Sequence, residues 1–219
     1  MTDVAPDGSP VAVYEALPVE PDLSRVCSVL QPGATVLDLG TGVGRIANPL
    51  ARAGHAVVAI DNSPAMLARV VGAETLLADV YALDLGRRFD VVLALSHLID
   101  SRAREQRRAL LRVCRAHVHD DGLVLLQRYP RGWTPTEGTN CVGDIGVHLH
   151  DVELLPDGFA AQVTYTLADD EWTQVFEGAV VDDAELSALA SEAGLVMRDV
   201  LDDEGIWVVL APEAPPARR

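Results

Sequence analysis

The feature that most constrains this chain is a short apolar run that ends in a glycine-rich turn. Residues 35–39 read TVLDL, and Gly40, Gly42 and Gly44 follow at alternate positions. A helical pattern of apolar residues begins directly after the last glycine. The order strand, tight loop and helix lets backbone N–H groups approach a ligand closely. We therefore expect a ligand site at this turn.

A second apolar run narrows the kind of ligand. Residues 56–60 predict a strand, and Asp61 follows at a position where a carboxylate accepts hydrogen bonds from the two hydroxyls of a ribose. Asp38 lies just before the first glycine, where its charge would repel a diphosphate at close range. The third glycine of the dinucleotide pattern G-x-G-x-x-G is also missing. An α-amino group suits Asp38 better, so the sequence predicts an amino acid joined to adenosine, bound at the carboxyl edge of a parallel sheet.

The chain resembles the class I S-adenosylmethionine-dependent methyltransferases, small-molecule type, in four motifs that occur in the family's order. These are DLGTGVG (38–44), DNSPAML (61–67), ADV (78–80) and FDVVLALSH (89–97). The likeness covers roughly residues 33–130 together with a family-like ending. A single glycine motif is a weak signal, whereas an ordered set is specific. The resemblance implies S-adenosylmethionine as the cofactor and S-adenosylhomocysteine as its product.

The resemblance also assigns roles to residues at the ends of the predicted strands. The glycine loop would pass beneath the methionine part of the cofactor, with Asp38 near its amino group. Asp61 would bind the ribose diol. Each of these carboxylates also has an ordinary alternative role, as a cap or a turn residue. The implied cofactor contacts are Asp38, Gly40, Thr41, Gly42, Gly44, Asp61, Asn62, Asp79, Val80, Ala94 and Leu95. Tyr14 would close over the cofactor or act as a hydrophobic staple.

Strands and helical patterns alternate along most of the chain, which predicts an α/β, doubly wound, mostly parallel sheet. The expected strands lie near 35–39, 56–60, 74–78, 90–95 and 122–128, with two last strands near 195–201 and 206–211. The resemblance makes this a seven-stranded, Rossmann-like methyltransferase sheet.

One region interrupts the alternation. Residues 145–181 hold three runs rich in β-formers, separated by turn signals, and predict an antiparallel β meander. The resemblance implies that this meander is inserted after strand five and forms part of a substrate lid. We expect one methyltransferase domain over residues 1–219. Residues 1–12, rich in Pro, Asp, Gly and Ser, predict a disordered tail, and residues 212–219 predict a loose one.

Methyl transfer from a sulfonium is an in-line displacement, so the protein chiefly aligns donor and acceptor and excludes water. His97 follows the fourth predicted strand and is the candidate general base, because an unperturbed imidazole pKa of about 6.5 suits proton removal near neutral pH. The alternative is a loop histidine that only shapes the pocket. Asp100 would orient the imidazole or bind a cationic acceptor, or else cap a helix.

Further substrate contacts are predicted on the same rim. Arg128 and Arg131 could grip a carboxylate and Tyr129 could wall an apolar acceptor, with edge packing as the alternative. His148 and His150 share one face of a predicted strand. Because no third ligand follows at a suitable spacing, substrate contact or a polar strand face is favoured over a metal site, and we expect no metal.

Charge and composition narrow the partners. The 219 residues carry a formal net charge of −16, which argues against nucleic acid, since counterion release needs a basic surface. The arginine-rich stretch 102–115 is expected to be a solvated helix face. The acidic excess in residues 134–217 favours an amine-bearing substrate, although a surface made acidic for solubility explains it equally. We expect a small-molecule substrate and leave the oligomeric state open.

Two absences bear on the compartment. No apolar run approaches the roughly 20 residues of a membrane span, and residues 1–7 carry no basic segment of a secretory signal. The three cysteines are widely spaced and form neither a metal motif nor a disulfide framework. These features predict a cytoplasmic protein that contacts no membrane.

Three function classes remain from the sequence. The first is a methyltransferase that acts on an O or N atom of a metabolite or biosynthetic intermediate. The second is a methyltransferase-like protein that binds the cofactor without transferring methyl, as a scaffold or a rearrangement or cyclisation catalyst. The third, an NAD(P)-dependent oxidoreductase, is disfavoured by Asp38 and by the missing glycine.

Overall fold

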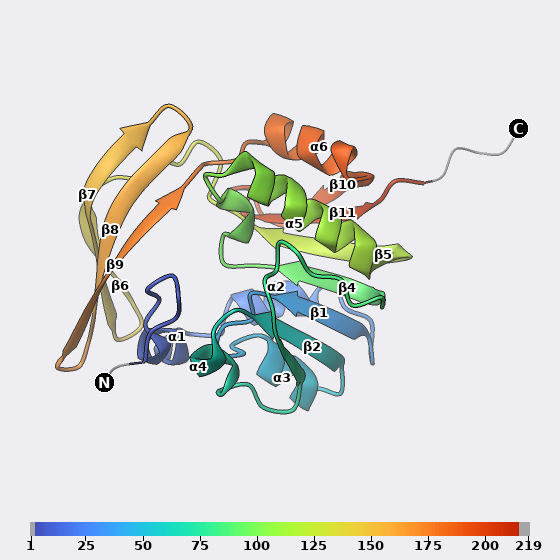
Figure 1. Ribbon diagram of the computed structural model, residues 1–219, viewed down its shortest axis with the longest axis horizontal. Coiled ribbons are helices and arrows are strands. Elements are labelled where there is room, and N and C mark those ends of the chain that lie inside the picture. The colour runs from blue at the N-terminus through green and yellow to red at the C-terminus, as the bar shows by residue number, and fades with distance from the viewer. Residues whose placement is uncertain (1–2, 215–219) are drawn as a thin grey trace, which may run out of the picture.

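The structure is a computed structural model, and it describes residues 3–214. Its main body is a seven-stranded sheet with the strand order β10-β11-β5-β4-β1-β2-β3 (Figure 1). The five strands from β5 to β3 run parallel, whereas β11 is antiparallel to β5 and β10 is antiparallel to β11. The bounds are β1 (Thr35–Leu39), β2 (Ala56–Asp61), β3 (Glu74–Leu77), β4 (Phe89–Ala94), β5 (Val118–Gln127), β10 (Leu195–Val200) and β11 (Trp207–Pro212). The predicted fold class is confirmed.

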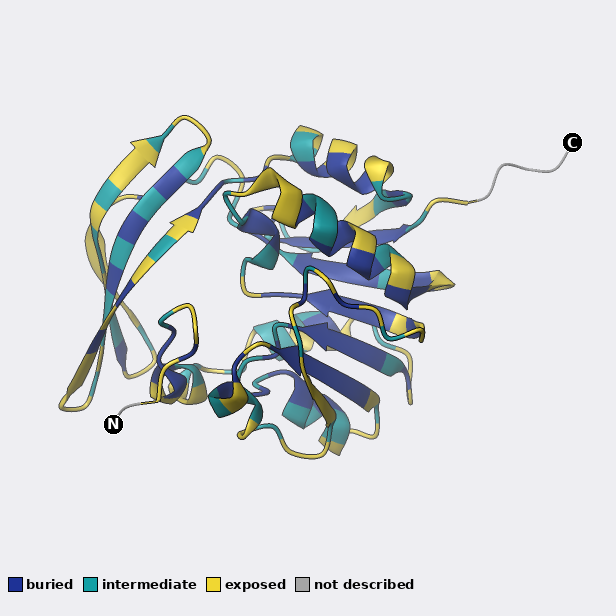
Figure 2. Cartoon of the chain, in the orientation of Figure 1, coloured by how far each residue is buried: buried dark blue, intermediate teal, exposed yellow. Residues whose placement is uncertain are grey.

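Helices cover both faces of this sheet because alternate strand residues are apolar on both sides. In β1, Leu37 and Leu39 face a core built with α5 and α6, whereas Val36 faces a core built with α2 and α3. Figure 2 shows these central strands in dark blue between the helical layers. The helices are α1 (Val11–Ala16), α2 (Asp22–Cys27), α3 (Ala47–Arg52), α4 (Pro64–Leu67), α5 (Arg104–His117) and α6 (Asp183–Glu192), with a 3-10 turn, η1 (Leu98–Asp100).

A second sheet, which we call the lid sheet, follows β5 in the chain and stands apart from the main sheet (Figure 1). Its strands are antiparallel in the order β6-β7-β8-β9. The bounds are β6 (Gly138–Val142), β7 (Ile145–Leu155), β8 (Gly158–Leu167) and β9 (Asp170–Gly178). The sequence predicts three of these strands and misses β6, because its residues GTNCV lack the β-branched alternation of a strand and lie mostly exposed at the sheet edge.

The N-terminal segment differs from its predicted disorder. Residues 3–10 form a closed loop, which we call the N-terminal loop, in which Ala5 N–H donates to Ser9 O (2.8 Å) and Val4 forms a β-bridge with Pro10. Ala5 is buried against Val43 in a small apolar cluster. These tertiary contacts order residues 3–10, although a composition rich in Pro, Asp, Gly and Ser does not favour local structure by itself. Residues 1–2 and 215–219 of the predicted tails lie outside the described residues.

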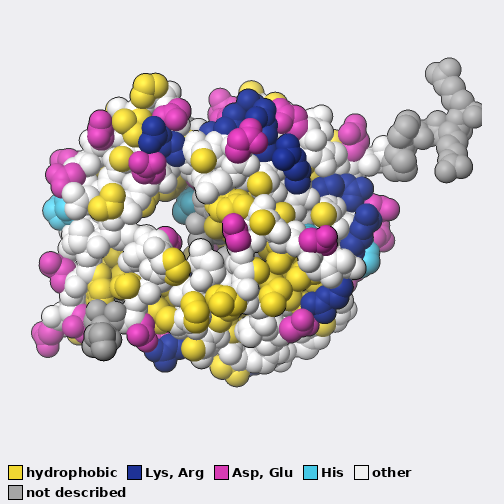
Figure 3. Space-filling model, viewed as in Figure 1, with side chains coloured by type: hydrophobic (Ala, Val, Ile, Leu, Met, Phe, Trp, Pro, Cys, Tyr) yellow, Lys and Arg dark blue, Asp and Glu magenta, His cyan; other side chains and the backbone are white. Residues whose placement is uncertain are grey.

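The arginine-rich helix α5 is engaged with neighbouring carboxylates. Arg107 donates to Glu185 on α6 (2.7 Å) and Arg108 to Glu192 (2.8 Å). In Figure 3, dark blue and magenta side chains intermingle over this part of the surface. Within residues 3–214, no helix is both long and apolar enough to cross a bilayer.

Candidate active site

The loop between β1 and α3 exposes bare backbone at the carboxyl edge of the sheet. Gly40, Gly42 and Gly44 have φ of +69°, +56° and +79°, a region that side chains rarely adopt. A Cβ on Gly40 would lie 3.0 Å from Leu98 Cδ1, and one on Gly44 would lie 2.6 Å from Asn48 Oδ1. The backbone conformation therefore favours glycine at all three positions, and Leu98 leaves little room for a side chain at Gly40.

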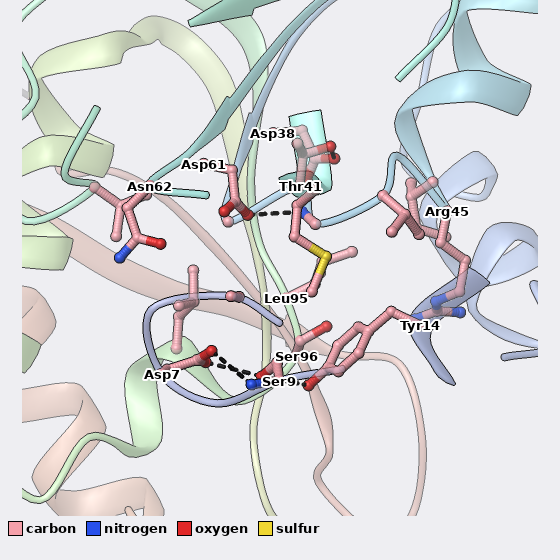
Figure 4. Close-up of a pocket in the computed structure, with 18 of the residues that line it drawn as sticks. Asp7, Ser9, Tyr14, Asp38, Thr41, Arg45, Asp61, Asn62, Leu95 and Ser96 are labelled. Carbon is pink, nitrogen blue, oxygen red and sulfur yellow. Dashed lines mark hydrogen bonds between the residues drawn. The ribbon is translucent and has the colours of Figure 1, made fainter. Parts of the chain in front are cut away.

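This loop forms the floor of a cavity of about 290 Å³, which we call the first cavity (Figure 4). The structure places around it every residue that the resemblance assigns to the cofactor except two. Gly44 belongs to the loop but does not line the cavity, and Ala94 is fully buried within β4. The predicted residues that line the cavity are Tyr14, Asp38, Gly40, Thr41, Gly42, Asp61, Asn62, Asp79, Val80 and Leu95.

Asp38 is a buried acid at the end of β1. Its Oδ2 accepts a hydrogen bond from the Thr41 hydroxyl (2.6 Å), and the residue is 3% exposed. Burial raises the pKa of this carboxyl from 3.8 to about 6, against the lowering effects of Thr41 and Arg45. A cationic ligand group would favour the ionised form by direct attraction.

Asp61, at the end of β2, ties the glycine loop to the next turn. Its Oδ2 accepts from Gly42 N–H (2.8 Å) and its Oδ1 from Ser63 N–H (2.9 Å). Burial raises the pKa of Asp61, and these two backbone donors oppose the rise. A carboxylate has about four acceptor positions, so Asp61 retains capacity for ligand hydroxyls.

The donor set of the first cavity fits a nucleoside joined to an amino acid. Carboxylates from β1, β2 and the segment after β3 offer acceptors to an ammonium, a diol and an amino group. Arg45 also lines the cavity, but its guanidinium donates to Asp22 (2.7 Å) and Pro18 O (3.0 Å). Such a set disfavours a diphosphate.

A second cavity, of about 570 Å³, adjoins the first beneath the lid sheet. Six residues line both cavities, namely Asp7, Ser9, Tyr14, Tyr81, Ser96 and Leu98. The contributions of Asp7 and Ser9 escaped the sequence analysis, because the N-terminal loop was expected to be disordered. Residues lining the second cavity alone include His97, Asp100, Tyr129, Tyr165, Gln174, Phe176 and Glu177.

His97 caps η1 in a left-handed conformation, with φ 63° and ψ 22°, which costs a non-glycine residue about 1–3 kcal/mol. Its Nδ1 lies 3.1 Å from Asp100 Oδ2, and its ring stacks on Tyr129 at 4.2 Å between centroids. Asp100 Oδ2 also accepts from Tyr129 N–H (2.7 Å), which leaves its buried Oδ1 with no partner in the described residues. These contacts hold the imidazole against the wall of the second cavity.

Tyr129 continues this wall as part of an aromatic stack. Its ring lies between His97 and Trp133, 4.3 Å from the latter, and Phe159 meets it edge-on at 5.8 Å. Burial raises the pKa of Tyr129 above its ordinary value of 10. The ring is therefore neutral, as its predicted role of an apolar wall requires.

The structure does not bring Arg128 or Arg131 to either cavity. Arg128 is fully buried and donates to Gly205 O (2.8 Å) and Val181 O (2.9 Å), as well as to Asp183. Arg131 donates to the other oxygen of Asp183 (3.0 Å). The two arginines thus fasten the start of α6 beside the end of β5, in place of the predicted grip on a substrate carboxylate.

His148 and His150 likewise lie outside both cavities, on β7. Their rings are 4.9 Å apart, and His150 is bonded to Thr164 (2.9 Å) and Asp151 (3.2 Å). The two histidines are placed away from the cavities because β7 lies two strands from β9, which borders the second cavity. Within residues 3–214, no group of three or more His, Cys, Asp or Glu is placed to hold a metal ion.

The chain is similar in sequence to known methyltransferases over part of its length. A family model described as a methyltransferase domain matches residues 36–122. The ubiquinone biosynthesis O-methyltransferase of Bradyrhizobium diazoefficiens is 29% identical over 112 residues, with 46% of this chain and 42% of that protein covered. The match therefore spans less than half the length of this curated relative.

Solved structures match over nearly the whole chain. The CcbJ methyltransferase from Streptomyces caelestis has a TM-score of 0.76 at 20% identity, covering 93% of this chain and 96% of that one. A sugar N-methyltransferase from Streptoalloteichus sp. has a TM-score of 0.72 at 19% identity, covering 98% of each chain. An aminopentose methyltransferase from Micromonospora echinaspora, solved with S-adenosylmethionine bound, has a TM-score of 0.68 at 20% identity, covering 92% of this chain and 95% of that one. At these identities the likeness establishes the fold, lid sheet included.

Proposed function

We propose that the chain is a class I S-adenosylmethionine-dependent methyltransferase, and that it methylates an oxygen or nitrogen atom of a small molecule bound in the second cavity. The methyltransferase domain model that matches residues 36–122 and the methyltransferase fold support this proposal. The observation that carries this proposal is the contact between the two cavities, which share six lining residues. S-adenosylmethionine is the cofactor of this family and supplies a methyl group already activated on a sulfonium. The chain's own residues bind the cofactor and the acceptor, align the two and exclude water.

In this proposal the first cavity holds the cofactor. Asp38 attracts its α-ammonium, Asp61 accepts from the ribose diol, and Asp79 accepts from the adenine amino group. The glycine loop brings backbone close to the methionine part, and Tyr14, which lines the same cavity (Figure 4), is the proposed cover over it. The fit of three carboxylates to three donor groups supports this assignment.

His97 is the proposed general base. With Asp100 accepting from Nδ1–H, the imidazole keeps Nε2 as a proton acceptor, so its tautomer suits proton removal from a hydroxyl or ammonium. Asp100 acts as a positioning residue through His97. The stack with Tyr129 restricts the ring further.

The substrate class follows from the size and position of the second cavity. A volume of about 570 Å³ suits a metabolite-sized acceptor, and we propose that the lid sheet confines it. Two solved proteins of this fold support a small acceptor, since one is a sugar N-methyltransferase and the other an aminopentose methyltransferase. A biosynthetic intermediate is the proposed acceptor.

The first experiment measures thermal stabilisation by S-adenosylhomocysteine and by NAD. We expect a concentration-dependent rise in Tm with the former alone. A rise with NAD alone would assign the first cavity to an oxidoreductase. Methyl transfer is then assayed with a panel of small alcohols and amines by release of S-adenosylhomocysteine. Cofactor binding with no turnover on any acceptor would instead favour a cofactor-binding scaffold or a rearrangement catalyst.

A further inference from the structure

The boundary between the two cavities is where an acceptor atom must lie to meet the methyl donor. Six residues form it, namely Asp7, Ser9, Tyr14, Tyr81, Ser96 and Leu98. His97 and Asp100 line the second cavity alone. The charge and hydrogen-bonding capacity of the boundary therefore decide which acceptor atom is stabilised there.

Asp7 is the one carboxylic acid among these six residues. The phenols of Tyr14 and Tyr81 remain protonated, because burial raises the pKa of both. The Asp7 carboxylate accepts from Ser9 N–H (3.0 Å) and from the Ser9 hydroxyl (2.9 Å), and the ion pairs formed within residues 3–214 do not include it. Asp7 thus presents a negative charge at the boundary without a cationic neighbour bonded to it.

The position of Asp7 is fixed by the lid sheet. Gln174, on β9, is buried, and its Nε2 donates to Asp7 O (3.1 Å) and to Ser9 Oγ (3.1 Å). Figure 4 shows Asp7 and Ser9 bonded to each other beside Tyr14, across the cavity from Asp61. Gln174 therefore fixes the main chain of Asp7 and the Ser9 hydroxyl, while the Asp7 residue itself is exposed at the boundary.

The rest of the second cavity has the same sign of charge. Within the described residues it is lined by no Lys or Arg. Glu177 is paired with Arg102 (3.0 Å) outside it, and Asp100 keeps one buried oxygen, Oδ1, without a partner. An anionic acceptor group would be repelled here, whereas an ammonium would gain charge-assisted hydrogen bonds.

We propose that Asp7 is a specificity-determining residue that binds the protonated amine of the acceptor at the boundary between the cavities. This inference rests on the proposed function and narrows its acceptor from oxygen or nitrogen to an amine. Asp7 holds the ammonium beside the donor, and His97 in the second cavity is the residue that takes up its proton. In that step the proton moves from the ammonium to the imidazole, which leaves a neutral amine and an imidazolium.

The test uses two stable analogues of S-adenosylhomocysteine that span both cavities. In each, a nitrogen replaces the sulfur and carries either a 2-aminoethyl or a 2-hydroxyethyl arm. The adenosine part anchors both analogues, so the ratio of their calorimetric dissociation constants reports the preference for an ammonium at the boundary. We expect the aminoethyl analogue to bind the wild-type protein about tenfold tighter than the hydroxyethyl analogue.

Two variants locate that preference. Asp7→Asn keeps an acceptor for Ser9 N–H and removes the charge, so the ratio should fall to about one. Asp3→Asn is the matched control, because Asp3 lies on the same N-terminal loop, lines neither cavity and is 3.9 Å from Arg69. It should keep the wild-type ratio.

Two results would overturn the inference. One is equal affinity of the wild-type protein for the two analogues, and the other is an unchanged preference in Asp7→Asn. Failure of S-adenosylhomocysteine itself to bind would instead overturn the proposed function, and the inference with it.

Discussion

The imidazole of His97 and the carboxylate of Asp100 lie 3.1 Å apart, Nδ1 to Oδ2, with Asp100 2% exposed and also bonded to Tyr129 N–H. His97 caps the start of η1 and Asp100 is the last residue of this turn, in the segment that follows β4. One buried acid thus fixes both the ring that faces the second cavity and the backbone of the aromatic wall beside it.

This pair predicts a separation of turnover from cofactor affinity. His97→Ala should lower kcat by about 10²–10⁴-fold, the usual contribution of a general base, and should leave the Kd of S-adenosylhomocysteine nearly unchanged. Steady-state kinetics and calorimetry measure the two quantities. His148→Ala is the matched control, because His148 is an exposed histidine outside both cavities. Equal losses in kcat and affinity for His97→Ala would indicate a structural role.

Asp61 predicts the opposite pattern. Asp61→Ala removes the proposed acceptor for the ribose diol and should weaken S-adenosylhomocysteine binding by about 1.5–3 kcal/mol. Asp84→Ala is a suitable control, since Asp84 forms a similar turn with Gly86 N–H (3.0 Å) and lines neither cavity. Melting without ligand separates a folding defect from a binding defect. Unchanged affinity would remove Asp61 from the diol site.

Replacing Asp38 is expected to raise the stability of the ligand-free protein and to weaken cofactor binding. Its folded-state pKa of about 6 lies above the ordinary 3.8, so the stability linked to this group is present below about pH 3.8 and is lost as the pH rises through 6. Asp38→Asn should therefore stabilise the ligand-free protein at pH 7.5 by about 2–3 kcal/mol. Urea unfolding measures this change, and a destabilised variant would contradict the burial argument.

The same carboxyl predicts pH-dependent cofactor binding. Above its pKa of about 6 Asp38 is ionised and attracts an α-ammonium, whereas below it the attraction is lost. The affinity for S-adenosylhomocysteine should fall by up to about tenfold per pH unit as the pH drops below 6. Calorimetry between pH 5 and 8 tests this. Asp38→Asn should bind weakly with a flatter pH profile.

Replacing Asp183 is expected to lower the stability of the protein without changing its affinity for the cofactor. Asp183→Ala removes the acid that Arg128 and Arg131 share, and leaves the fully buried Arg128 guanidinium with carbonyl partners alone. The Asp183 side chain is 45% exposed and Arg128 retains two bonds, so we expect a loss below that of a fully buried pair, about 1.5–3 kcal/mol. Urea unfolding and calorimetry with S-adenosylhomocysteine measure the two effects. A shifted cofactor affinity would place the arginines closer to the site than the structure does.

The sequence predicts the first cavity well because its residues follow from local signals. Parallel strands end at one edge of the sheet, so acids placed just after successive strands, such as Asp38 and Asp61, must converge. The positive φ values of the loop require glycine, and glycine is visible in the sequence.

The second cavity depends on partners that are distant in the chain. Arg128 follows a strand end as the rim prediction requires, but Asp183 and the carbonyl of Val181 draw its side chain away. The N-terminal loop is ordered by Gln174, more than 160 residues later. Composition carries no signal for a contact of that range, so Asp7 could not be found from the sequence.

The lid sheet shares no strand ladder with the main sheet. The lid sheet, whose strand β9 lines part of the second cavity, is thus a unit separate from the strands whose ends line the first cavity. A chimaera that receives residues 138–178 from another protein of this fold should keep its affinity for S-adenosylhomocysteine and change its preference among acceptors. Such an exchange would leave unchanged β1 and β2, which contribute Asp38 and Asp61 to the lining of the first cavity.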